Sequence, residues 1–146
     1  MDENEFKRKF CSVLKNTYGF STQCHEDKYE IDIADTSFAA EGIDGWIEFK
    51  HLKSKPSKTT DIFNYIKFRR GQRLWMIERG EKGGGHVYLI LSIEETNAAY
   101  IFDIHTNSLM VLDKMTWQEF VSLSSASSIE AAPRMFASLI AEYLDG

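Results

Sequence analysis

Apolar and polar positions along the chain predict a mixture of helices and strands. Residues 3 to about 17 have apolar side chains at helical spacing, which predicts an amphipathic helix that Gly19 ends. The face that we expect to be buried carries Phe6, Phe10, Val13, Leu14 and Tyr18. A continuous apolar run from Val87 to Ile93 is typical of a strand buried on both faces. Residues 98 to 104 follow a turn near Asn97 and predict its partner strand.

The middle of the chain predicts a hairpin with arms at 28–40 and 45–52. We expect the turn at Gly42–Gly45, with Ile43 and Asp44 at its tip. Side chains alternate along a strand, so Glu48 and Lys50 should point to one face. Ile47, Phe49 and Leu52 are expected on the opposite, apolar side.

Asp35 lies on the first arm of this hairpin, and pairing of odd with even positions puts it on the face of Glu48 and Lys50. A turn at Ile43–Asp44 would set Asp35 opposite Leu52, about 13 Å along the strand from Glu48. We therefore expect a bulge or a longer loop that slides Asp35 toward Glu48.

Further helices are predicted before and after the apolar strand at 87–93 in the sequence. Ile62 to Phe68 gives a weak helical or extended signal, and a helix is expected from Arg69 to Glu78 that stops at Gly80. Thr116 and Glu119 form a capping box for a short helix to about Leu123, which the serine cluster at 122–128 breaks. A last helix over 129–144 accepts Pro133 in its opening turns, and its core or dimer face carries Met135, Phe136, Leu139, Ile140 and Tyr143.

The hairpin residues suit metal-assisted phosphodiester hydrolysis. Asp35 and Glu48 supply carboxylate oxygens, the ligands that Mg²⁺ prefers, and the backbone carbonyl of Phe49 is a third candidate ligand. A bound ion would acidify a water molecule and draw charge from the phosphate. Lys50 would then stabilise the developing oxyanion.

The order of these motifs resembles the PD-(D/E)xK nuclease superfamily. Ile33-Ala34-Asp35 stands where the family has its Pro-Asp, and Glu48-Phe49-Lys50 matches the (D/E)xK element. The run from Gly71 to Trp75 is similar to the Gln-x-x-Trp helix of the VRR-type and phage or Holliday-junction-resolvase-like branch. The glycine turn at 83–85 and the strand after it resemble the same branch. The likeness covers roughly residues 28 to 105, with alanine in place of the proline.

This resemblance implies an α/β (α+β) fold with a restriction-endonuclease-like core, in which helices flank a mixed central sheet. It implies a Mg²⁺- or Mn²⁺-dependent DNA endonuclease, with branched DNA as a candidate substrate and Gln72 positioning water or phosphate. A surface glutamine is the alternative for Gln72. Glu5 would be an additional acid, as in part of the superfamily, although first-turn helix acids are common. The resemblance also makes a homodimer and a phage- or mobile-element-like origin candidates. The two cysteines indicate a reducing cytoplasm, that of the bacterial host if the protein is phage-encoded.

Charge is distributed unevenly along the chain, whose net charge is -5. From residue 49 to 75 there are 8 cations against 1 acid, a balance of +7 that leaves -12 elsewhere. This local basic stretch predicts DNA binding, and a solvated lysine-rich loop is the alternative. Its cations other than Lys50 are Lys53, Lys55, Lys58, Lys67, Arg69, Arg70 and Arg73. Trp46, Tyr65 and Phe68 are candidates for stacking on unpaired bases.

The remaining features exclude several classes of protein. The length of 146 residues suits one domain, with the nuclease core at about 28–105 and a helical part at about 113–146. No apolar run approaches the ~18 residues of a membrane span, and two cysteines indicate no disulfide framework. Cys24 and the histidines match no familiar zinc spacing. The alternative to an enzyme is an inactive nucleic-acid-binding or regulatory module on the same fold. For the enzyme, alanine at Glu48 or Lys50 should abolish cleavage and leave folding intact.

Overall fold

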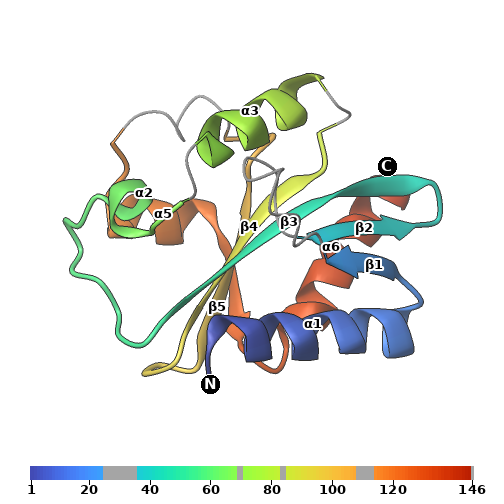
Figure 1. The fold of residues 1–146 in the computed structure, drawn as a ribbon, viewed down its shortest axis with the longest axis horizontal. Helices are drawn as coiled ribbons and strands as arrows, with labels where there is room; N and C mark the ends of the chain where they lie inside the picture. Colours follow the sequence, from blue (N-terminus) through green and yellow to red (C-terminus); the bar gives the residue numbers. More distant parts are fainter. Residues whose placement is uncertain (25–35, 69–70, 83–84, 108–113, 146) are drawn as a thin grey trace.

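The computed structural model describes residues 1–24, 36–68, 71–82, 85–107 and 114–145. Six strands form one sheet in chain order (Figure 1). The strands are β1 (Ser21–Cys24), β2 (Thr36–Ala40), β3 (Ile43–Leu52), β4 (Val87–Ile93), β5 (Ala98–Asp103) and β6 (Ser125–Ser128). The helices are α1 (Glu3–Tyr18), α2 (Ile62–Tyr65), α3 (Gln72–Lys82), α5 (Trp117–Leu123) and α6 (Ala132–Asp145).

The sheet is mixed because one pair of neighbours differs from the others. Strands β3 and β4 are parallel, and every other neighbouring pair is antiparallel. Parallel neighbours need a long crossover, and here it contains α2 and α3. The crossover therefore places two helices on one face of the sheet, over β4 and beside β3, the strand that carries Glu48.

Helices cover both faces of the sheet, so the molecule has three layers (Figure 1). On one face, α1 and α6 pack on Ile47, Phe49 and Ile90 around Phe136. On the other face, α2, α3 and α5 pack on the alternate residues of β4, which are Val87, Leu89, Leu91 and Ile93. Every residue of β4 is buried, as the continuous apolar run predicts.

The hairpin turn lies two residues earlier than predicted. Ala40 pairs with Ile43, so Glu41 and Gly42 form the two-residue turn, with φ of 45° and 89°. Two successive positive φ values are those of a type I′ turn, whose twist matches that of the strands. Residue 36 thus pairs with Ile47, whereas the predicted turn would pair it with residue 51, a shift of four positions. Pairing is regular from residue 36 to the turn, so the described part of the hairpin contains neither the expected bulge nor the longer loop.

Two short strands were not expected from the sequence. β1 has the sequence STQC and pairs with β2, and β6 has the sequence SASS and pairs with β5. Neither strand alternates apolar and polar residues, which is the pattern that predicts a strand from sequence. Both lie at an edge of the sheet, where backbone hydrogen bonds to one neighbour hold them. The serine cluster does end α5, but it then joins the sheet.

Most predicted helices are present, with corrections at their ends and faces. α1 is capped by Asp2 and ends at Gly19, which is left-handed with φ of 74°. Val13 and Tyr18 are exposed, and Lys7 and Cys11 are buried in their place. The capping box of Thr116 and Glu119 and the early position of Pro133 in α6 are confirmed, whereas Tyr143 of the predicted apolar face is exposed.

Gly80 does not stop the third helix, contrary to the prediction. α3 starts at Gln72 and continues through Gly80 to Lys82, and residues 69–70 of the predicted start lie outside the described residues. A Cβ on Gly80 would lie 3.4 Å from the Cα of His105. The glycine therefore allows close packing of the helix on the segment after β5 rather than ending it.

No helix in the described part of the chain is long and apolar enough to cross a membrane.

Candidate active site

Glu48 is the centre of the candidate site, and it is buried under α3. It lies in the middle of β3, where its Cα pairs with that of Leu89, and its side chain is on the α3 face of the sheet. Only 2% of its surface is exposed. Leu52 also packs on this face, which corrects its predicted place beside Ile47 and Phe49. A carboxylate in such a place needs polar partners, because an unpaired buried charge is very costly.

Lys50 supplies the first partner, from two residues along the same strand. Its Nζ lies 3.2 Å from Oε2 of Glu48. The same ammonium group donates to the backbone carbonyl of Lys67 at 2.8 Å and lies 5.3 Å from the ring centroid of Phe68. The predicted common face of Glu48 and Lys50 is therefore confirmed, and the segment after α2 fixes the position of the ammonium group.

Gln72 supplies the second partner, from the first residue of α3. Its Nε2 donates to Oε1 of Glu48 at 2.7 Å, and Gln72 is completely buried. The surface alternative for Gln72 is thus wrong. The first turn of a helix has unpaired backbone N–H groups and a positive dipole end, so α3 also presents a favourable electrostatic environment to the carboxylate.

Trp75 and Trp46 pack beside this cluster. Their rings meet edge to face with centroids 5.1 Å apart, and both pack against the core under α3. The guanidinium group of Arg79 lies 5.7 Å from the Trp75 ring. The prediction that Gln72 faces the carboxylate while Trp75 packs on the core next to it is confirmed.

Asp35, the other predicted metal ligand with a carboxylate, lies outside the described residues. It is bonded to Thr36, which is buried and pairs with Ile47, the residue before Glu48. Consecutive Cα atoms are about 3.8 Å apart, so the chain enters the described part of β2 close to Glu48. Among the described residues, no three His, Cys, Asp or Glu side chains gather as a metal site would require.

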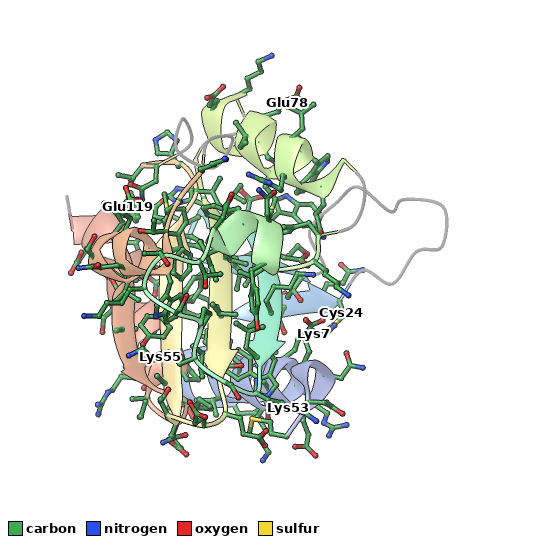
Figure 2. The ribbon with its side chains drawn as sticks, turned by 90° about the vertical axis from the view of Figure 1, so that its left-hand side faces the viewer. Lys7, Cys24, Lys53, Lys55, Glu78 and Glu119 are labelled. Carbon is green, nitrogen blue, oxygen red and sulfur yellow. The ribbon has the colours of Figure 1, made fainter. Side chains whose placement is uncertain are left out.

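The basic stretch divides into two groups in space. Lys53 and Lys55 lie at the end of the sheet opposite α3 (Figure 2). There the backbone of both residues is hydrogen-bonded to Glu95, in the turn between β4 and β5. Lys58 is exposed, and its carbonyl accepts from the start of α5.

The second group lies beside the candidate site. Lys67, whose carbonyl accepts from Lys50, follows α2, and Arg73 is the second residue of α3, in the same groove. Arg73 is partly buried, and this desolvation lowers its pKa, with a smaller opposing effect of Asp61. Arg69 and Arg70 belong to the residues that are not described. Among the described cations of the basic stretch, Lys50 contacts Glu48, Lys67 and Arg73 lie on the segment that holds Lys50, and Lys53 and Lys55 lie at the far end of the sheet.

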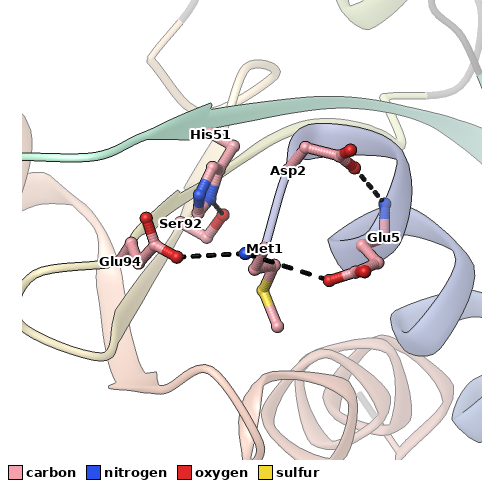
Figure 3. Close-up of polar contacts among 6 residues, drawn as sticks. All are labelled: Met1, Asp2, Glu5, His51, Ser92 and Glu94. Carbon is pink, nitrogen blue, oxygen red and sulfur yellow. Dashed lines mark hydrogen bonds and ion pairs between the residues drawn. The ribbon is translucent and has the colours of Figure 1, made fainter.

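Glu5 contacts a different cluster, on the α1 side of the sheet. Its carboxylate lies 4.0 Å from the amino group of Met1, which also donates to Glu94 at 3.0 Å (Figure 3). These contacts lower the pKa of Glu94 and raise that of the amino group. His51 faces the same cluster, with its Nδ1 2.6 Å from the hydroxyl oxygen of Ser92. Among the described residues, Glu5 thus belongs to this cluster, on the opposite face of the sheet from Glu48.

Sequence reasoning missed the part that Lys67 and Phe68 play in holding Lys50. Lys67 contributes its backbone carbonyl, a group that every residue carries, so no side-chain pattern marks it. Phe68 was noted only as an aromatic that could stack on a base. The sequence signal that could have indicated this role is that Phe68 lies only four residues before Gln72, the residue already assigned to the site.

Comparisons with known proteins agree with this architecture. No protein-family model matches the chain, and no curated protein matches its sequence. The structure is similar to that of Hjc, a Holliday junction resolvase from the archaeal hyperthermophile Archaeoglobus fulgidus. The TM-score is 0.54 at 14% sequence identity, over 89% of this chain and 98% of that chain. The chain therefore has a resolvase-like α+β fold with a mixed sheet flanked by helices, which confirms the predicted fold class.

Proposed function

We propose that this protein is a metal-dependent DNA endonuclease that hydrolyses phosphodiester bonds in branched DNA. The observation that carries the proposal is the buried contact of Glu48 with both Lys50 and Gln72, on a fold that resembles a Holliday junction resolvase. A cluster of this kind is costly to bury for structure alone, because apolar residues would pack as well.

The ligands that we propose suit a Mg²⁺ or Mn²⁺ ion by their chemistry, because hard cations prefer oxygen. Glu48 and Asp35 would hold it with carboxylate oxygens, with the backbone carbonyl of Phe49 as a further ligand. When bound, the ion supplies an activated water and neutralises charge on the phosphate. The buried position of Glu48 supports this role, since a dry site strengthens electrostatic interactions.

The protein's own groups have separate tasks in this proposal. Lys50 is held by a carbonyl and an aromatic ring, so its ammonium group is fixed beside the carboxylate and can donate to a phosphate oxygen as charge develops there. Gln72 orients the Glu48 carboxylate by donating to one of its oxygens. Lys67 and Arg73 would hold the DNA backbone near this point.

The proposal includes two copies of the chain, because resolving a four-way junction requires two cuts. The native mass of the purified protein, alone and with junction DNA, tests this part. A single copy bound to a junction that is cut on one strand only would contradict it.

Cleavage of a four-way junction and of supercoiled plasmid tests the activity. We expect cleavage that depends on Mg²⁺ or Mn²⁺ and that falls by roughly a hundredfold or more in Glu48→Gln and in Lys50→Met. Glu78→Gln, an exposed acid on α3, is the matched control and should cut like wild type (Figure 2). Circular dichroism confirms that each variant is folded.

Two outcomes would count against the enzyme. Cleavage by Glu48→Gln at the wild-type rate would show that the cluster is not catalytic. Tight binding of junction DNA with no cleavage in either metal would favour the inactive binding module on the same fold.

A further inference from the structure

An open groove lies between α2 and the start of α3, with a volume of about 670 Å³. Figure 2 shows α2 in front of β3 and β4, with α3 above it. Its lining includes the side chains of Phe63, Asn64, Lys67, Phe68, Arg73 and Leu74.

Part of the groove has an apolar surface that the protein itself does not cover. Leu74, at the rim, is 52% exposed. The half-buried ring of Phe68 is stacked on the buried ring of Phe63 in the wall, with centroids 6.3 Å apart. Tyr65, the last residue of α2, is 51% exposed just outside the groove. Large apolar side chains grouped at the surface and bordered by polar residues are typical of a binding site.

Positive charge borders this apolar surface. Lys67 is exposed, and the guanidinium group of Arg73 lies 5.4 Å from the Phe63 ring while donating to Asn64 at 3.2 Å. Asp61, the acid that acts on the pKa of Arg73, accepts a hydrogen bond from the amide of Asn64 at 2.7 Å. An occupant should therefore combine a flat apolar group with an anionic one.

The groove also adjoins the candidate active site. The Phe68 ring that lines the groove is the ring beside the Lys50 ammonium group, and the carbonyl of Lys67 accepts from that same group. A ligand that touches Phe68 is thus one side chain away from Lys50. This proximity suits a nucleotide next to the bond that is cut.

We propose that the groove binds an unpaired nucleotide of the DNA substrate, a step that rests on the proposed nuclease function. The base lies against Phe68 and Leu74, and Lys67 and Arg73 hold the adjacent phosphates. Base-paired duplex cannot supply this contact, because the faces of its bases are stacked on one another. Stacking of a base on an aromatic side chain tolerates any sequence, so the groove selects DNA structure and not sequence.

Binding measured in EDTA, where no cleavage occurs, tests this proposal. The probe is a duplex with one unpaired 2-aminopurine nucleotide, compared with the fully paired duplex by fluorescence anisotropy. We expect wild type to prefer the unpaired probe by about five- to 150-fold, the range that one stacked base gives. Stacking of the 2-aminopurine should also quench its fluorescence.

Two variants remove the groove contacts, and two matched controls leave them intact. Leu74→Ser and Lys67→Ser should lose most of the preference and of the quenching. Leu144→Ser on α6 and Lys9→Ser on α1 change exposed residues of the same types elsewhere and should bind like wild type.

Equal affinity of wild type for both probes, or a full preference in Leu74→Ser and Lys67→Ser, would overturn the proposal. Metal-dependent cleavage by wild type in that case would leave the endonuclease standing without this groove. A preference that depends on Leu74 and Lys67, in a protein that never cleaves, would support the groove and remove the endonuclease.

Discussion

Removing either charge of the Glu48–Lys50 pair should destabilise the protein, and removing both should cost clearly less than the sum of the two single losses. The pair is 3.2 Å apart, with Lys50 only 14% exposed at its side chain. At an effective dielectric constant of about 20, Coulomb attraction at this distance is about 5 kcal/mol before the cost of desolvation. The sequence alone led us to expect that alanine at either position would leave folding intact, and the burial of Glu48 now predicts a clear loss of stability.

The two single variants should differ in size. Lys50→Met leaves a carboxylate that is 2% exposed without its ammonium partner, and we expect a loss of about 3 kcal/mol in the free energy of unfolding. Glu48→Gln keeps the shape of the side chain and leaves Lys50 bound to the Lys67 carbonyl, so about 1–2 kcal/mol is expected. The double variant should lose only about 1–2 kcal/mol, because no uncompensated charge remains.

Urea unfolding at pH 7 in EDTA, followed by circular dichroism, gives the three free energies. The expected coupling between the two positions is about 2–3 kcal/mol, against a total stability of roughly 5–15 kcal/mol. Single losses that add up to the loss of the double variant within about 0.5 kcal/mol would refute the reasoning. In that case solvent must reach Glu48, and the proposed dry site would fail with it.

Two further predictions test the packing and the helix cap around the site. Gly45→Ala should lose about 1–3 kcal/mol in the free energy of unfolding in urea, because its Cβ would collide with the carbonyl of His86 at the start of the β3–β4 pairing. Gly80→Ala should lose less, because the nearest contact of its Cβ is at 3.4 Å. The reverse order of the two losses would contradict this packing. Thr116→Ala should lose about 1 kcal/mol at pH 7 by removing the cap of α5. The hydrogen bonds of Thr116 lower the pKa of Glu119, so this carboxylate stabilises the fold above its ordinary value of 4.5, and the difference between the variants should shrink as the pH falls below that value. A difference that stays constant down to acid unfolding would show that the capping box is not what stabilises α5.

Local patterns predicted those parts of the fold in which each residue's surroundings follow from its neighbours in sequence. The buried run of β4 and the capping box of Thr116 are such cases. The turn was misplaced because Glu41 is an unusual residue at positive φ, while Gly45, the glycine assigned to the turn, is instead needed where β3 approaches His86. Glycine signals alone do not distinguish these two uses.

The candidate site was predictable where one strand carries it and less so where the crossover completes it. Alternation placed Glu48 and Lys50 together, and the resemblance to a known helix motif indicated Gln72. The burial of Gln72 depends on how α3 docks on β3, and the carbonyl of Lys67 depends on the path between α2 and α3. Neither is encoded in a local pattern, because both arise from packing across the sheet.

The two edge strands of the sheet bear on how copies of this protein meet. β1 and β6 are four residues long and consist mainly of serine and threonine, with no apolar side chain larger than cysteine. Long, flat, apolar edges invite other chains to add strands, which leads to aggregation, and short polar edges offer little for such growth. The protein should thus stay dispersed at high concentration, and a pair of copies on one DNA would meet through helices or loops rather than through a shared sheet.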